Sequence, residues 1–310
     1  MSDWWWLGFG AVVAALLGLD LFVFHRRPGR EGARRALAWS AVWIALGLGF
    51  SVVVGFARGH DAALSYVTAY LIEQSLSVDN LFVFVALFAY FGVAPEHHHR
   101  VLFWGIIGVV ITRGAFIFAG VALISRFHWV VYVLGVLLVA TAGKLGLGGD
   151  DQVHPDKNFV VRWASRVLPV VKSYHGDRFV ISTAGGLRFT PLILVLIAIE
   201  STDVMFAVDS VPAVLAISRD PFVVYTSNVF AVLGLRALYF VLAGALRSLR
   251  FMRPALAVIL GLVGVKMLLA EVVEVPTEAA LAVIAVILGL ATAASLLMPA
   301  PRPRKSGHGG

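Results

Sequence analysis

Five carboxylate side chains lie deep inside apolar stretches that are long enough to cross a membrane. They are Glu73, Asp79, Glu200, Asp203 and Asp209. An ionised side chain at the centre of a bilayer costs at least about 2.5–3.5 kcal/mol, so each must face a partner or a wet cavity. Negative charge without a partner is relieved by a proton or by a bound cation. The five acids therefore predict a cation site inside a membrane.

The first acidic stretch, EQSLSVDN (73–80), places three polar side chains on one face of a helix. Glu73, Ser77 and Asn80 fall at positions i, i+4 and i+7. Asp79 points roughly 120° away from that face, because each residue turns a helix by about 100°. We expect Asp79 to reach a neighbouring helix while the other three side chains line a cavity.

The second acidic stretch, ESTDVMFAVDS (200–210), ends shortly before a proline. Glu200 and Asp203 share a helix face at i and i+3, whereas Asp209 points the other way on a straight helix. Pro212 cannot bond to the carbonyl four residues before it, so a kink is favoured there. Freed carbonyls beside a carboxylate suit a hard cation.

The ligand atoms in these stretches are all oxygens. The acids and Asn80 are accompanied by the hydroxyls of Ser77, Ser201 and Ser210, and the chain has no cysteine. Disulfides and thiolate metal sites are therefore excluded. Oxygen ligands suit Mn²⁺, Ca²⁺ or Mg²⁺ better than Cu⁺ or Zn²⁺, without separating the first three ions. No prosthetic group is expected, since the metal would be the bound or transported ion.

Four basic residues also lie within the apolar stretches, and their spacing indicates an internal repeat. They are Arg113, Lys144, Arg236 and Lys266. The two arginines follow Asp79 and Asp203 by 34 and 33 residues, and the two lysines follow the arginines by 31 and 30. The sequence around the acids agrees, because SVDNLFVF (77–84) resembles STDVMFAV (201–208). Two related units of three helices are predicted.

The acid and the arginine of each unit have a second interpretation as a structural ion pair. Asp79 with Arg113, and Asp203 with Arg236, would then hold each repeat together. Five acids against four bases still leave net negative charge. A proton-coupled cation site is therefore predicted beside a charge-pairing or gating role for the bases.

The elements that carry these residues are membrane helices, because 60% of the chain is hydrophobic, 14% is charged and the mean hydropathy is +0.89. The fold class predicted is all-α, a polytopic membrane helix bundle with about nine spans. The expected spans are 4–24, 36–57, 63–92, 101–124, 129–147, 187–217, 222–245, 254–270 and 277–299.

Basic residues in alternate loops predict the orientation of the bundle. One set of loops holds 18 of the 25 Lys and Arg, which places that side in the cytoplasm, the N-terminus outside and the C-terminus inside. An odd number of spans per unit inverts the second unit relative to the first, an arrangement found in secondary transporters. The domain prediction is one transmembrane domain over 1–310. Its parts are repeats 63–148 and 187–270, a cytoplasmic loop 149–186 and a disordered tail 300–310.

Other features of the sequence argue against nucleic-acid binding and against enzymatic activity. The net charge of +7 is explained by topology, so no nucleic-acid partner is expected. No nucleophile motif, phosphate-binding glycine loop or ATP signature occurs, and we expect no enzymatic activity. The segment PEHHHR (95–100) is expected in a cytoplasmic loop that either captures a divalent ion or is simply solvated or pH-sensing, with no obvious zinc site. An amphipathic stretch near 158–172 is expected at the membrane surface.

Several motifs resemble the TerC family of bacterial membrane proteins, most closely its Alx branch, over residues 1–270. They are EQSLSVDNLFVF (73–84), ESTDVMFAVDSVPAVLAI (200–217), LGLRALYFVLAG (233–244) and GVKML (264–268). The resemblance implies a bacterial inner-membrane protein of Mn²⁺ export, in a family named for tellurite resistance. It implies a metal site of Glu73, Asp79, Asn80, Glu200, Asp203 and Asp209. TAGKLGLGG (141–149) matches GVKML weakly, which puts the role of Lys144 in doubt.

Three function classes remain open. A carrier that exports Mn²⁺ against protons across the lipid bilayer fits the inverted repeat and the excess of acids, and we favour it. An oxyanion carrier needs the arginines and lysines unpaired and facing the cavity. A membrane scaffold for metal delivery or protein assembly would keep its role after carboxylate-to-amide changes. The sequence fixes neither the ion nor the oligomeric state.

Overall fold

The computed structural model describes residues 4–24, 33–147, 158–183, 186–245, 251–270, 272 and 275–298. Within helices, the side chains of Asp79 and Arg236 and of a few other positions lie outside the described part.

In the described part of the chain, nine long helices form the bundle, in agreement with the predicted membrane fold. They are α1 (Trp4–Phe24), α2 (Ala33–Arg58), α3 (His60–Phe91), α4 (Pro95–Arg126), α5 (Val130–Gly146), α7 (Pro191–Leu215), α8 (Pro221–Ala245), α9 (Met252–Leu268) and α10 (Thr277–Leu297). Five of them, α2, α4, α7, α8 and α10, are long and apolar enough to cross a membrane by themselves. The chain is therefore a multi-pass helical membrane protein, as its composition predicts.

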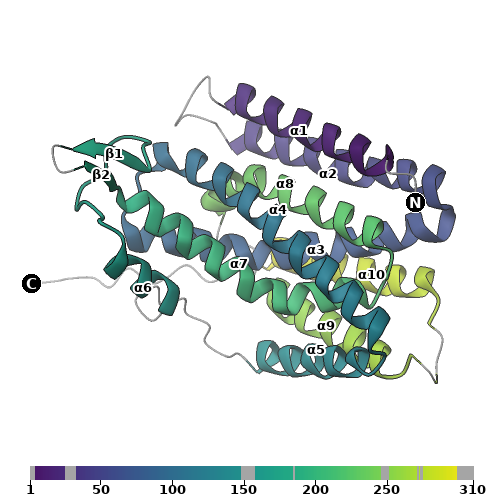
Figure 1. Ribbon diagram of the computed structural model, residues 1–310. Coiled ribbons are helices and arrows are strands. Elements are labelled where there is room, and N and C mark those ends of the chain that lie inside the picture. The colour runs from purple at the N-terminus through teal and green to yellow at the C-terminus, as the bar shows by residue number, and fades with distance from the viewer. Residues whose placement is uncertain are drawn as a thin grey trace, which may run out of the picture.

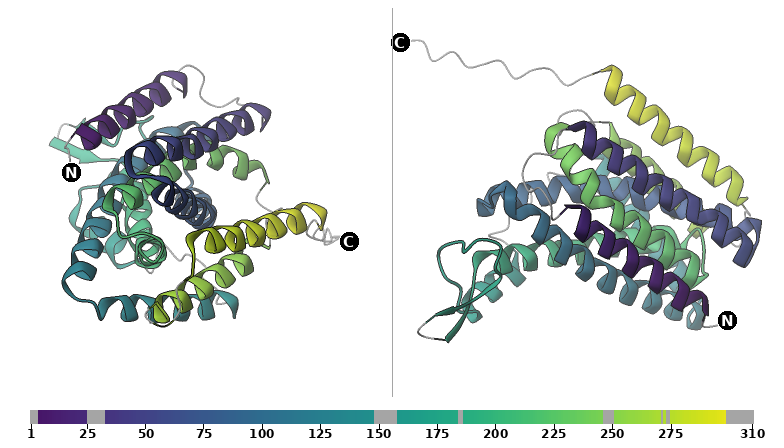
Figure 2. Two further views of the ribbon diagram at one scale, coloured as in Figure 1. Left: turned by 90° about the vertical axis from the view of Figure 1, so that its right-hand side faces the viewer. Right: turned by 90° about the horizontal axis from the view of Figure 1, so that it is seen from above.

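The helices lie side by side, with a short helix and a hairpin at one end of the bundle (Figure 1). α6 (Phe159–Val167) and the antiparallel strands β1 (Val180–Thr183) and β2 (Gly186–Phe189) form this end. α1 and α2 occupy one edge and α5 with α9 the opposite edge, while α10 lies on the outside (Figure 2). α3 is central, because it contacts α2, α7, α8 and α10.

The contacts between helices are symmetric with respect to the two predicted units, whose relation by repeat stays a prediction. α3 packs on α8 and α4 packs on α7, while α5 packs on α9. The first predicted unit is α3, α4 and α5, and the corresponding helices of the second are α7, α8 and α9. If corresponding helices are exchanged, the α3–α8 contact becomes the α7–α4 contact, and the α5–α9 contact stays the same. The two units thus interlock along their length instead of forming two separate bodies.

Helix boundaries follow proline and glycine. Pro95 and Pro191 occupy the first turns of α4 and α7, where a missing N–H costs no hydrogen bond. Gly92 ends α3 in a left-handed conformation with φ of 63°, which returns its N–H to the carbonyls of Ala89 and Phe88.

Two sequence-based expectations need correction at the hairpin end. The segment PEHHHR is the first turn and a half of α4 and not a loop, because Pro95 starts the helix there. The span predicted at 187–217 begins four residues later, because 187–189 belongs to β2 and Pro191 opens α7. The hairpin itself was not predicted from the sequence, since its strands are only four residues long.

Candidate functional site

Arg113 of α4 is fully buried and binds carboxylates from two other helices. Its Nη1 donates to Glu73 Oε2 of α3 at 2.6 Å, and its Nη2 donates to Asp203 Oδ1 of α7 at 3.1 Å. Nε lies 3.3 Å from Asp203 Oδ2, so Asp203 meets two nitrogens of the guanidinium fork. One cation and two anions therefore connect α3, α4 and α7.

Two neutral side chains complete this cluster. Ser210 accepts a hydrogen bond from Arg113 Nη1 at 2.9 Å. Asn80, with its amide turned so that both atoms find partners, accepts from Arg113 Nη2 at 3.2 Å and donates to the carbonyl of Leu76. We call these five residues the arginine cluster: Glu73, Asn80, Arg113, Asp203 and Ser210.

The cluster carries more negative than positive charge. Glu73 and Asp203 together oppose the single charge of Arg113, and both are at most 1% exposed. Glu73 Oε1 and the nearby hydroxyl of Ser77 are buried, and neither finds a hydrogen-bond partner among the described residues. A buried acceptor without a partner is costly, so the cluster has unused capacity for a proton or a cation.

The ion pair joins the two predicted repeats. Arg113 belongs to the first unit and Asp203 to the second, whereas the sequence predicts pairs within each unit. The observed pair arises because α4 packs along α7. The side chains of Asp79 and Arg236 lie outside the described residues, so the predicted pairs that involve them stay predictions.

Glu200 lies one turn before Asp203 on α7 and faces α4. Its carboxylate rests against the backbone of Gly108, where any Cβ would collide with it, and Gly105 lies within about one turn on the same face. Both carboxylate oxygens are buried without a hydrogen-bond partner in the described part of the chain. Glycine at position 108 therefore makes the space in which this carboxyl fits.

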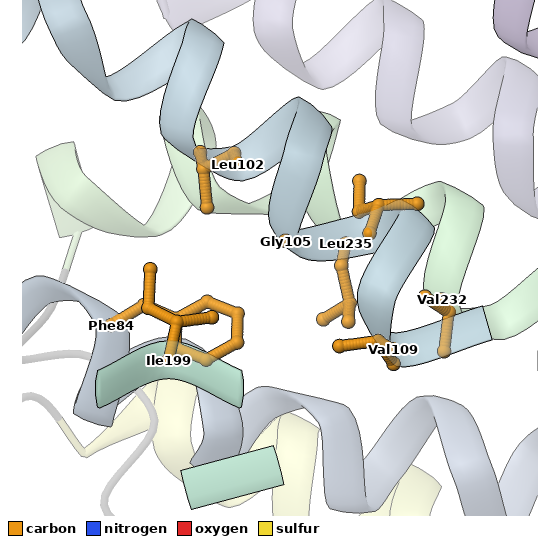
Figure 3. Close-up of a pocket in the computed structure, with 8 residues that line it drawn as sticks. Phe84, Leu102, Gly105, Val109, Ile199, Val232 and Leu235 are labelled. Atoms are coloured by element: carbon orange, nitrogen blue, oxygen red, sulfur yellow. The ribbon is translucent and has the colours of Figure 1, made fainter. Parts of the chain in front are cut away.

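The wall beside Glu200 is apolar. A cavity of about 10 Å³ lies between α3, α4, α7 and α8 (Figure 3). Its lining includes Phe84, Gly105, Ile199 and Leu235 and presents no polar surface. A buried water needs two to four polar partners, so this cavity stays dry and Glu200 gains no solvation from it.

Asp209 lies apart from the arginine cluster. Its Oδ1 accepts a hydrogen bond from Thr141 Oγ1 of α5 at 2.8 Å. α7 continues as a helix through Pro212 to Leu215, with Pro212 buried inside it. The described members of the predicted metal set therefore occupy three places: the arginine cluster, the Gly108 face and the Thr141 contact.

None of these places is a preformed metal site among the described side chains. No three acids or histidines of the described residues lie close enough together to hold a metal ion. An ion that binds here must therefore compete with Arg113 for Glu73 and Asp203, or bring Glu200 to them.

The segment between the repeats reaches into the neighbourhood of Glu200. Asn158 caps α6 by accepting from the N–H groups of Val160 and Val161, and its Nδ2 donates to Ser201 Oγ at 2.9 Å. α6 is strongly amphipathic and packs along α7, and its place at the membrane surface stays a prediction.

Two of the three histidines at the start of α4, His97 and His98, make specific hydrogen bonds. His97 Nδ1 lies 2.5 Å from Asp177 Oδ1, which ties α4 to the segment before the hairpin. His98 donates from Nε2 to the carbonyl of Val93, since a carbonyl only accepts, and its Nδ1 accepts from Tyr239 of α8. The histidines are therefore structural contacts and not a solvated loop.

Tyr174 fastens the same segment to the end of α3. Its hydroxyl donates to the carbonyl of Phe91 at 2.6 Å. Partial burial raises the pKa of Tyr174, so this hydroxyl keeps its proton as a donor.

The remaining predicted residues differ in environment. Lys144 is exposed near the end of α5, whereas Lys266 of α9 is half-buried beside a second cavity. Sequence reasoning missed Gly108, Thr141, Asn158 and Asn228. Asn228 is 1% exposed on α8, and its amide has no partner among the described residues. A polar residue within an apolar span was the available signal for it, but Gly108 carries no such signal.

Comparisons with known proteins agree with the resemblance in the motifs. The model described as "Integral membrane protein TerC family" matches residues 58–303. The chain is 43% identical over 292 residues to "Uncharacterized membrane protein STKORF319" of Myxococcus xanthus, covering 94% of this chain and 92% of the relative. It is 41% identical over 292 residues to "Putative membrane-bound redox modulator Alx" of Escherichia coli strain K12, covering 90% of each. No solved structure matches the chain.

Proposed function

The chain belongs to the Integral membrane protein TerC family, and on that premise we propose that it carries a divalent cation, foremost Mn²⁺, across the bacterial inner membrane in exchange for protons. The proposal makes the chain a carrier and not an enzyme. The positive-inside pattern supports an N-terminus outside and a C-terminus in the cytoplasm, so the direction of transport would be export.

The observation that carries the proposal is the carboxyl of Glu200. Both of its oxygens are buried and lack a hydrogen-bond partner among the described residues, one turn from Asp203. An ionised carboxylate in that setting needs a counter-charge. A proton or a metal ion supplies it, and exchange of one for the other is the elementary step of a proton-coupled cation carrier.

Arg113 supports the same proposal from the same α4–α7 contact, where it binds Asp203 one turn after Glu200. Its guanidinium bridges Glu73 and Asp203 in the way that a bound metal ion would. An entering ion that binds Glu200 and draws Asp203 away from Arg113 would exchange one counter-charge for another without leaving either carboxylate bare. The oxygen ligands lie on α3 and α7 and the guanidinium on α4, so such an exchange would move α7 relative to α3 and α4.

The name of the relative Alx refers to a redox role. This chain contains no cysteine, so it has no thiol chemistry of its own. A redox effect would therefore arise through the metal ion that the carrier removes.

The test is metal flux in proteoliposomes under an imposed pH gradient, with Mn²⁺ and Ca²⁺ compared. Wild type is expected to move Mn²⁺ faster with the gradient than without it. Glu200→Gln should reduce the flux to that of empty liposomes, because the amide cannot exchange a proton for an ion. Glu278→Gln is the matched control, since Glu278 is exposed in the first turn of α10.

Three results would count against the proposal, each against a different part of it. Absence of flux of either ion in well-folded wild type would favour the scaffold. Equal flux in wild type and Glu200→Gln would leave transport standing but remove Glu200 from it. Flux that is independent of the pH gradient would remove the proton coupling alone.

A further inference from the structure

A second cavity lies at the end of the bundle opposite the hairpin. It has a volume of about 120 Å³ and lies between the start of α5, the end of α7 and the end of α9. Its lining includes Val131, Leu215, Ser218, Arg219 and Lys266. The arginine cluster does not extend to it, since none of the five cluster residues lines this cavity.

Two cations line this cavity, and the described residues offer no counter-charge to either. Lys266 is half-buried in the wall and Arg219 is exposed at the rim, and neither side chain has an ion pair or hydrogen bond within the described chain. Asp220, which follows Arg219 in the sequence, is engaged elsewhere, because it pairs with Arg58 at 3.6 Å. No carboxylate lines the cavity among the described residues.

A hydroxyl adds a third donor. Ser218 lines the cavity, and its Oγ accepts from the N–H of Asp220 at 3.2 Å, which leaves its own proton available to donate. An ammonium, a guanidinium and a hydroxyl are donors that bind the oxygens of a tetrahedral anion. A divalent cation would be repelled from the same place.

The volume of the cavity and its position at the end of the bundle limit which ligands could bind there. A volume of about 120 Å³ holds several water molecules or one small oxyanion. Phe127 and Trp129, just before α5, are 42% and 62% exposed at this end of the bundle. Exposed aromatic side chains at helix ends are typical of the headgroup layer, where lipid phosphates lie.

We propose that Lys266, Arg219 and Ser218 form a binding site for a phosphate group at this end of the bundle. The group is either the headgroup phosphate of an anionic phospholipid or a free inorganic phosphate ion. The site is independent of the proposed cation transport and would fasten α5, α7 and α9 to one another at their ends.

The experiment uses the full chain in detergent micelles with two probes. Inorganic phosphate is titrated at constant ionic strength against chloride, with the melting temperature as readout. Phosphatidylglycerol is titrated against diacylglycerol, which lacks the phosphate, with native mass spectrometry as readout. Lys266→Gln and Arg219→Gln are compared with wild type, and Arg126→Gln is the control because Arg126 is exposed at the end of α4 and outside the cavity.

We expect at least one probe to bind wild type, and each variant to weaken that binding about tenfold, the usual effect of losing one charged hydrogen bond. Arg126→Gln should bind as wild type does. Response to phosphatidylglycerol alone assigns the lipid, and response to inorganic phosphate assigns the free ion. No binding of either probe, or equal binding in wild type and both cavity variants, overturns the proposal. Arg219 is exposed, so Arg219→Gln is expected to fold normally, and weaker binding by this variant would not be a result of misfolding.

Discussion

Two helix pairs of this bundle use glycine for opposite purposes. Between α5 and α9, Gly135 and Gly264 face each other, and a Cβ on Gly264 would lie 2.9 Å from the Cβ of Leu138 and 3.0 Å from the carbonyl of Gly135. Between α4 and α7, Gly108 faces the carboxyl of Glu200. Gly135 and Gly264 bring two helix backbones together, whereas Gly108 makes room for a charged group.

The difference separates packing from chemistry. Helices in a membrane associate through close packing of small residues, because lipid supplies no hydrophobic drive between them. The α5–α9 contact follows that rule with an apolar surface. The α4–α7 contact buries the carboxyl groups of Glu200 and Asp203 and the guanidinium of Arg113, with Glu73 of α3 beside them. Apolar residues of similar volume would match or exceed this arrangement in stability. The charges at α4–α7 are therefore best explained by function.

The largest effect is expected from removing the cation of the α4–α7 contact. Arg113→Gln leaves Glu73 and Asp203 buried without a counter-charge, which costs about 3–5 kcal/mol. Thermal unfolding in detergent is the measurement, and Arg113→Lys should recover only part of the loss, because an ammonium lacks the guanidinium fork.

The matched control removes the anions together with the cation. A triple variant with Arg113→Gln, Glu73→Gln and Asp203→Asn should be more stable than Arg113→Gln alone. If Arg113→Gln unfolds at the temperature of wild type, the cluster is open to water and the charge argument for α4–α7 fails.

The second effect tests the apolar contact. Gly264→Ala forces a methyl group between α9 and α5, which costs about 1–3 kcal/mol as overpacking. Gly143→Ala is the control on α5, because a Cβ there meets nothing within 4 Å. It should leave stability unchanged or raise it slightly. Equal melting temperatures for the two variants would show that α5 and α9 are free to separate.

The contrast also shows how far the sequence alone could lead. Hydropathy located the spans, because twenty apolar residues have no other stable arrangement in a bilayer; the span predicted at 36–57 lies within α2, Ala33–Arg58. The acids were found because charge in an apolar run is rare. Glu73 and Asn80 were placed on one face by spacing alone, and both contact Arg113.

The partners of these residues could not be predicted in the same way. Spacing relates positions along one helix, whereas the pair of Arg113 with Asp203 depends on which helices pack together. Gly108 resembles any other glycine of an apolar span until α7 is placed against it. Asn158 lies outside the spans, so its contact with Ser201 depends on the path of the loop before α6.

The smallest effect on stability, with a large effect on transport, is expected at Gly108. Gly108→Ala drives the carboxyl of Glu200 from its place, and the cost stays below about 1 kcal/mol because the displaced atoms end a flexible side chain. Melting temperature and Mn²⁺ flux are measured for Gly108→Ala, Glu200→Ala and the double variant. Glu200→Ala removes the clash, so the double variant should show no added loss of stability, which is the signature of direct coupling.

Gly49→Ala, in open space on α2, is the control. Wild-type flux in Gly108→Ala would mean that transport does not need Glu200 at the α4 face, and additive stability losses in the double variant would mean that the two residues do not touch.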